Sequence, residues 1–270
     1  MFILPTPLHG QPGPVAGWLN TAGWTAAASR LGFGVTVLTS FGVIESDSLR
    51  DRALSLKASL TTARRVSSTL PVPLKVALKD VRDFVRARRF ARLVGRTGPQ
   101  GRPSFVWQRH ELFQRAGRRL ADQMGCPLVL YVPAPKVWEA RAWGVRRPGW
   151  EAIVERFGDV TPLQEADLVA CVSHEVAEAV GLLGIDPKRI IVTPSTVDTE
   201  LFRPDLDISD IRRRYSLEGR FVVGWAGSFR SFHGLDVLLD AIETASSQIP
   251  HLVGLLVGDG PDRERLEKDV

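Results

Sequence analysis

The feature that most constrains this chain is a strand–turn–helix–strand–turn succession close to its C-terminus. Apolar runs at Phe221–Ala226 and Leu252–Val257 predict two strands, and Leu235–Ala245 between them predicts an amphipathic helix. A Gly-rich turn follows each strand, at Gly227–Gly234 and at Gly258–Pro261. Strands joined through one helix run parallel, so both turns are expected at the carboxyl edge of one sheet, where open α/β folds bind anionic ligands.

The same alternation runs through residues 1–200. Further strands are predicted at Phe2–Leu4, Val35–Thr39, Ser104–Trp107, Pro127–Val132, Leu168–Val172 and Arg189–Val192. Helices are predicted at Val15–Leu31, Glu111–Met124, Trp150–Phe157, Leu163–Ala166 and His174–Leu183. The strands show no alternation of apolar and polar residues, which is typical of a parallel sheet covered on both faces.

These patterns predict an α/β protein of two domains. The first is a complete Rossmann-like domain over 1–200, followed by a linker over 201–219 and a second Rossmann-like unit over 220–270. The second stretch holds only the first β-α-β-α part of such a domain, which is too small to bury both faces of a sheet. We therefore expect the chain to be truncated at its C-terminus.

One segment makes the chain basic. The whole chain carries a net charge of +5, but residues 48–102 hold 14 Lys and Arg against 3 Asp and Glu, a net +11. Within this insert, an apolar stripe at helical spacing is flanked by basic residues. The stripe consists of Leu74, Leu78, Val81 and Val85. Two interpretations stay open: a solvated outer helix, or a helix resting on an anionic membrane surface. Nucleic acid is not an expected partner, because aromatic residues are sparse here.

The cysteines and histidines indicate no metal site or disulfide. Cys126 and Cys171, the only cysteines, lie in apolar runs and are expected to be buried thiols. The five histidines lack metal-ligand spacing. No signal peptide or membrane-spanning run is visible, so a cytoplasmic location is expected. If the basic helix rests on an anionic membrane, the protein is expected to be peripheral on the inner face of that membrane.

The two C-terminal turns supply the strongest binding candidates. Glycine lets backbone N–H groups approach a phosphate, an arginine offers it a two-pronged contact, and the N-terminus of the following helix favours an anion. The residues assigned to this site are Gly227, Ser228, Arg230, His233, Gly258 and Gly260. The alternative for each turn is a tight loop without a ligand.

Candidates in the first domain are weaker. Gly10 and Gly13 lie in the loop after the first strand and could face a phosphate, although no dinucleotide fingerprint or P-loop is present. His110 follows a strand and is a weak catalytic candidate, with a structural role as the alternative. Trp138 with Glu139 could contact an acceptor.

Several segments, in order, resemble the GT-B glycosyltransferases of family 4, also called glycosyl transferases group 1. They are Val106–Pro135, Glu165–Pro204, Gly224–Ala241 and Leu255–Glu267. The resemblance implies two Rossmann-like domains with a cleft between them and a nucleotide-sugar donor held on the second. It also implies that neither a metal nor another cofactor is needed, because positive side chains and a helix dipole stabilise the departing diphosphate.

The resemblance also assigns residues and shows departures. Arg230 matches the family's diphosphate-binding arginine, whereas His233 stands where a lysine is usual. Gly258 and Gly260 match the turn beside the nucleotide. The usual Asn-Gly-Val-Asp hinge is Ser195–Asp198 here, and the family's Glu-x7-Glu segment has no counterpart within the chain.

The expected function is therefore retaining, metal-independent transfer of a sugar from a nucleotide-diphosphate sugar to a glycan or lipid-linked acceptor, as in polysaccharide biosynthesis. The truncated chain is expected to be inactive alone. Two alternatives stay open: a GT-B-like nucleotide-sugar epimerase, and a non-catalytic module that binds phosphate or an anionic membrane.

Overall fold

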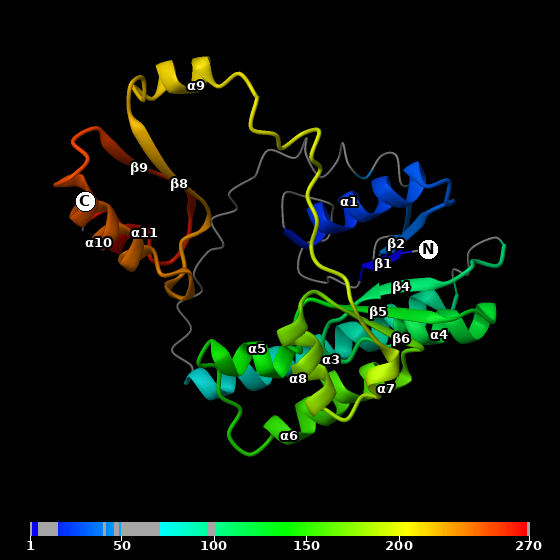
Figure 1. The fold of residues 1–270 in the computed structure, drawn as a ribbon. Coiled ribbons are helices and arrows are strands. Elements are labelled where there is room, and N and C mark those ends of the chain that lie inside the picture. Colours follow the sequence, from blue (N-terminus) through cyan, green and yellow to red (C-terminus); the bar gives the residue numbers. More distant parts are fainter. Residues whose placement is uncertain are drawn as a thin grey trace. The chain divides into compact units, whose positions relative to one another are not determined.

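The computed structural model describes residues 2–4, 16–39, 42–45, 49, 71–96 and 101–268. The chain divides into two compact units, Met1–Asp198 (unit 1) and Thr199–Val270 (unit 2). Both combine strands and helices in the part of the chain that the structure describes (Figure 1). Each unit is described by itself below.

Unit 1 is built on one sheet with the strand order β3-β2-β1-β4-β5-β6-β7. Its strands are β1 (Phe2–Leu4), β2 (Thr36–Thr39), β3 (Gly42–Glu45), β4 (Val106–Arg109), β5 (Leu128–Val132), β6 (Leu168–Cys171) and β7 (Ile190–Val192). All pairs are parallel except β2 with β3, which is antiparallel. The expectation of a wholly parallel sheet was thus wrong at this edge. Only two residues separate β2 from β3, which is too short for a parallel crossover.

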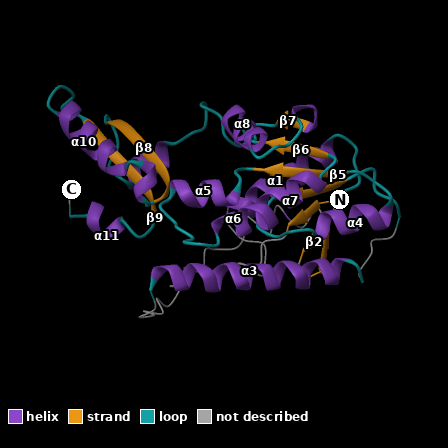
Figure 2. Ribbon diagram, turned by 90° about the horizontal axis from the view of Figure 1, so that it is seen from below, coloured by secondary structure: helices purple, strands orange, loops and turns teal. Residues whose placement is uncertain are grey.

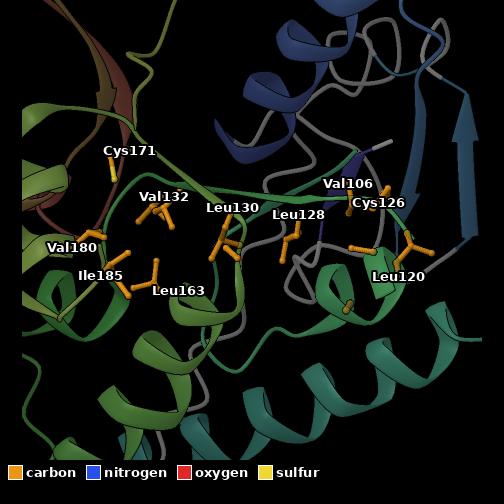
Figure 3. Packing of buried hydrophobic residues seen from close by; sticks show 14 of the residues in the cluster. Val106, Leu120, Cys126, Leu128, Leu130, Val132, Leu163, Cys171, Val180 and Ile185 are labelled. Atoms are coloured by element: carbon orange, nitrogen blue, oxygen red, sulfur yellow. The ribbon is translucent and has the colours of Figure 1, made fainter. Parts of the chain in front are cut away.

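Two layers of helices cover the sheet. They include α1 (Ala16–Arg30), α3 (Val72–Val94), α4 (Ala116–Met124), α5 (Lys136–Ala142), α6 (Glu151–Val154), α7 (Thr161–Glu165) and α8 (His174–Leu182). Alternate residues of each strand enter opposite layers. Leu128, Leu130 and Val132 join one hydrophobic cluster with α3, α4, α7 and α8 (Figure 3), whereas Tyr131 joins a second cluster with Trp18 of α1. Continuous apolar strands are the consequence of this two-sided burial.

Helix α3 lies along one side of unit 1 (Figure 2) and packs through a different face from the one its apolar stripe suggests. Its buried residues are Asp80, Ala87, Phe90 and Val94. The stripe of Leu74, Leu78, Val81 and Val85 is exposed. On a helical wheel the two sets lie almost opposite each other. The face that carries Ala87 and Phe90 therefore packs on the core, and the apolar stripe faces away from it. Among the helices that the structure describes, none is both long and apolar enough to cross a membrane.

A π-helical stretch, Glu155–Val160, connects α6 to α7 without a break. The sequence predicted two separate helices here, and that prediction was wrong. The wider turn accommodates Pro162, which has no N–H to donate. The carbonyl of Gly158 accepts the Phe113 N–H at 3.1 Å, and Phe113 adopts a positive φ of 64°.

Unit 2 contains the β-α-β arrangement expected from the sequence. Strand β8 (Phe221–Ser228) pairs in parallel with β9 (Leu252–Asp259), and α10 (Leu235–Ser246) connects them. A short helix, α9 (Ser209–Arg214), lies within the predicted linker, and α11 (Arg263–Leu266) follows β9. Leu235, Phe229 and Leu266 form the small buried core of this unit.

Candidate functional site

The two Gly-rich turns of unit 2 lie side by side at the carboxyl ends of β8 and β9. The register aligns Gly227 with Gly258 and Ser228 with Asp259. The pairing continues into the turns: the Phe229 N–H donates to the Asp259 carbonyl at 2.9 Å. The sequence-predicted residues Gly227, Ser228, Gly258 and their neighbours in the turns are therefore brought together on one edge.

Two of these glycines are required by the backbone itself. A Cβ at position 258 would overlap the carbonyl oxygen of Gly227, and one at position 260 would overlap the carbonyl oxygen of Phe229. Any side chain at either position would push the two turns apart. The glycines thus keep the backbones of the two turns in close contact. The Gly260 N–H donates to Asp259 Oδ1 at 2.8 Å.

Arg230 is the free cation of this edge. Its side chain is exposed and has no ion-pair or hydrogen-bond partner among the residues described. His233 is held differently: its Nε2 lies 3.1 Å from Ser228 Oγ, and its ring lies 5.0 Å from that of Trp225. Gly234, with a φ of 63°, turns the chain into α10, whose N-terminus therefore opens beside Arg230.

At the carboxyl edge of the unit 1 sheet, His110 is fully buried. Its Nε2 lies 2.7 Å from Asp159 Oδ1. The same carboxylate accepts the N–H groups of Lys136 at 2.9 Å and Val137 at 2.7 Å, at the start of α5. His110 thus joins β4, the π-helical stretch and α5 through Nε2, whereas its buried Nδ1 has no hydrogen-bond partner among the described residues. The structural and the catalytic interpretation of His110 both stay predictions.

The charge state of Asp159 follows from these contacts. Burial by itself would raise the pKa of Asp159, but the hydrogen bonds from His110, Val137 and Lys136 outweigh it and hold that pKa below its ordinary value. An ionised carboxylate only accepts hydrogen bonds, so His110 Nε2 is the donor. The sequence analysis missed Asp159, because it is 49 residues from His110 and carries no motif.

The remaining candidates in unit 1 are Gly10, Gly13, Trp138 and Glu139. Gly10 and Gly13 lie outside the described residues. Trp138 is exposed on α5, and Glu139 pairs with Lys136 at 3.1 Å. In the ranges that the structure describes, no three His, Cys, Asp or Glu side chains gather as metal ligands would.

Both cysteines are free and buried, as predicted. Burial raises the pKa of the Cys171 thiol to about 11. Cys171 ends β6 inside the main hydrophobic cluster, so it acts as a small apolar side chain.

The sheet of unit 1 and the β-α-β arrangement of unit 2 define a Rossmann-like class of α/β protein, and comparison with known proteins gives the family. A family model described as Glycosyltransferase Family 4 matches residues 23–201, which is most of unit 1. The chain belongs to this glycosyltransferase family, as the sequence resemblance indicated.

Curated relatives include two D-inositol 3-phosphate glycosyltransferases. The one from Nocardioides sp. is 32% identical over 163 residues, which cover 59% of this chain and 35% of the relative. The one from Stackebrandtia nassauensis is 31% identical over 129 residues, which cover 44% and 29% respectively. The chain spans about a third of the length of the curated relatives it matches.

Solved structures confirm the GT-B type of fold. Anabaena Alr3699/HepE in complex with UDP has a TM-score of 0.53 at 14% identity, covering 99% of this chain and 63% of that one. The same protein with UDP-glucose has the same TM-score. S. aureus MnaA with UDP has a TM-score of 0.50 at 14% identity, covering 100% of this chain and 65% of that one.

Proposed function

We propose that this protein takes part in the transfer of a sugar from a nucleotide-diphosphate sugar to a glycan or lipid-linked acceptor. The observation that carries the proposal is the free guanidinium of Arg230 at two adjoining Gly-rich turns of a parallel strand pair. Membership of the glycosyltransferase family supports sugar transfer. Neighbours of this fold that bind UDP and UDP-glucose support a nucleotide-sugar donor.

In this proposal the residues of unit 2 hold the donor diphosphate. Arg230 would form a two-pronged contact with phosphate oxygens, and the absence of a side chain at Gly227 and Gly258 would allow the backbone to approach them closely. Helix α10, of 12 residues, would direct the positive end of its dipole at the same place. These groups would stabilise the charge that develops on the leaving diphosphate.

Three finer features belong to the same proposal. Transfer would need no metal, since a guanidinium and a helix dipole supply positive charge where a cation would otherwise do so. Retention of configuration is carried over from the family resemblance. Acceptor binding is assigned to unit 1, and a cytoplasmic location, peripheral to an anionic membrane through 48–102, accompanies it.

The test is a binding screen with UDP-, GDP- and ADP-sugars without added metal, read by ligand-observed NMR so that weak binding is detected. We compare the native chain with Arg230→Ala and with Arg213→Ala. Arg213 is the matched control, because it is an exposed arginine of the same unit that pairs only with Asp210.

Binding of one nucleotide sugar that weakens about 10- to 100-fold in Arg230→Ala and stays unchanged in Arg213→Ala supports the proposal, since a charge-assisted contact contributes about 1.5–3 kcal/mol. Binding that ignores Arg230, or no binding at all, rejects the donor site. Equal binding of inorganic phosphate and nucleotide sugars indicates the anion-binding module instead.

A further inference from the structure

A large groove opens on the outside of unit 1, between α3, α4 and the continuous helix from α6 to α7. Its volume is about 1250 Å³. We call it the outer groove. Its walls bear large apolar side chains, and arginines from α3 and α4 line it as well. The apolar lining includes Val81, Phe84, Phe113, Trp150, Ile153 and Phe157.

The apolar walls are more exposed than a monomer's surface requires. Val81 on α3 is 60% exposed, and Ile153 and Phe157 on the facing helix are 59% and 56% exposed. Val81 also belongs to the outward stripe of α3 that includes Leu74 and Leu78. The stripe and the groove therefore join into one apolar surface contributed by two separate helices, which marks an interaction site rather than scattered exposed residues.

The groove is held in shape by neighbouring contacts. Phe113 adopts its positive φ of 64° at the groove wall, and its ring meets the edge of Phe84 at 5.5 Å between centroids. Asp80 binds Arg147 at 2.9 and 3.1 Å and Trp150 Nε1 at 3.0 Å, which fixes α3 to the opposite wall. A strained residue and a buried ion pair at one cavity indicate a preformed surface.

Three arginines of the groove carry uncompensated charge. Arg88, Arg92 and Arg119 are exposed, and no carboxylate pairs with any of them in the described part of the chain. Arg88 lies over the Phe84 ring at 5.5 Å, and Arg92 and Arg119 donate only to backbone carbonyls, at 3.4 and 3.2 Å. By contrast, the neighbouring Arg115 and Arg118 are paired with acidic side chains.

The apolar and cationic parts of the groove follow each other along α3, and Arg88 lies between them over the Phe84 ring. Val81 and Arg92 are eleven residues apart, or about 16 Å at the helical rise of 1.5 Å per residue. A ligand that fits both ends has an anionic head and a hydrocarbon chain at least that long. A nucleotide or a sugar phosphate satisfies the arginines but not the apolar walls.

We propose that the outer groove binds an anionic phospholipid and so attaches unit 1 to a negatively charged membrane surface. The lipid phosphate contacts Arg88, Arg92 and Arg119, and an acyl chain lies along Val81 and Phe157. The stripe on α3 enters the lipid interface beside it. This proposal rests on the peripheral membrane position included in the proposed function and names its ligand. The groove is in unit 1 and the donor-site residues are in unit 2, so loss of vesicle binding and loss of donor binding are distinguishable.

The experiment is flotation of the 270-residue chain with vesicles of phosphatidylcholine alone or mixed with phosphatidylglycerol. The charge variant is Arg88→Gln/Arg92→Gln/Arg119→Gln. Its control, matched for net charge, is Lys188→Gln/Arg203→Gln/Arg213→Gln, which changes exposed residues outside the groove. The apolar variant is Val81→Asp/Phe157→Asp, and its control is Leu182→Asp, at an α8 residue that is 84% exposed.

We expect binding to the mixed vesicles only, lowered about fivefold for each arginine removed and thus about 100-fold in the triple variant. The apolar variant should lose binding, and both controls should keep it. Circular dichroism verifies folding; all altered side chains are exposed, so the variants should fold. UDP-sugar binding should be unchanged throughout.

Four results would overturn the proposal. The first is equal binding to both vesicle types. The second is equal loss in variant and control. The third is displacement of the chain from vesicles by millimolar inorganic phosphate with no effect of the apolar variant, which would assign the arginines to a free phosphate. Concentration-dependent dimerisation without vesicle binding would make a second copy of this chain the occupant.

Discussion

Removing the Asp80 carboxylate is expected to destabilise unit 1 far more than removing the Asp83 carboxylate, although both lie on α3. The Asp80 side chain is 6% exposed and faces the Arg147 guanidinium, which is 3% exposed. Asp80→Ala leaves that guanidinium charged and without a carboxylate in the interior, where Nη1 already has no partner. Breaking a buried ion pair from one side costs about 3–5 kcal/mol.

Asp83 provides the matched control. It pairs with Lys79 at 2.8 Å, but the Lys79 side chain is 50% exposed and its charge stays hydrated after Asp83→Ala. An exposed pair four residues apart on a helix contributes about 0.3–0.5 kcal/mol. The free energies of unfolding of the two variants should therefore differ by at least about 2 kcal/mol.

Urea unfolding followed by tryptophan fluorescence measures both variants, and a third variant sharpens the test. Asp80→Leu/Arg147→Met removes both charges and should recover most of the stability, because two apolar side chains replace the pair. Midpoints for Asp80→Ala and Asp83→Ala that coincide would refute the reasoning, and so would a double variant that is less stable than Asp80→Ala.

Three further changes test other contacts. Asp159→Asn should cost about 2–3 kcal/mol at neutral pH. The folded pKa of Asp159 is lowered from 3.8, so its stabilisation is fully present above the unfolded pKa and is lost as pH falls through the folded one. The urea midpoints of variant and native chain should therefore approach each other as pH falls from about 4 toward the folded pKa, and a constant gap would contradict this. Gly258→Ala should cost more than about 3 kcal/mol and expose the β8 and β9 amides to hydrogen exchange. Gly224→Ala is the control and should change exchange little, because its Cβ would meet nothing within 4 Å. Similar exchange in the two variants would reject the overlap argument. Ser173→Ala removes the N-cap bond to Val176 N–H and should cost about 1 kcal/mol by urea unfolding, with Ser173→Asn close to native; an unaffected Ser173→Ala would show that the cap contributes nothing.

Local signals in the sequence predicted much of the fold. Each predicted strand is present in the structure. A short apolar run buries the side chains on both of its faces when it forms a strand of a parallel sheet that is covered by helices on both sides. Helix α8 begins at His174, as predicted, and the Ser173 side chain caps it by accepting the Val176 N–H. Strand β3 and helices α5 and α9 were not predicted, because they are short and carry little periodicity, so tertiary contacts decide them.

Contacts between distant residues could not be predicted in the same way. The stripe on α3 has the spacing of a buried face, but Phe90 and Ala87 on the other side pack on the sheet. Asp80 and Arg147 are 67 residues apart, and nothing in either neighbourhood signals the other. In the candidate site, Arg230 and the glycines were predicted because a turn is a local sequence pattern. The burial of His110 depends on the π-helical stretch that carries Asp159, and no sequence motif predicts that stretch.

The burial of both cysteines has a practical consequence for thiol chemistry. With a pKa of about 11, about one Cys171 in a thousand is a thiolate at pH 8, and Cys126 is covered as well. A cysteine introduced at an exposed position such as Leu182 or Phe232 should therefore react with maleimides far faster than either native thiol. The wild-type chain should therefore give a low background when site-specific fluorophores or spin labels are attached, without prior replacement of its own cysteines.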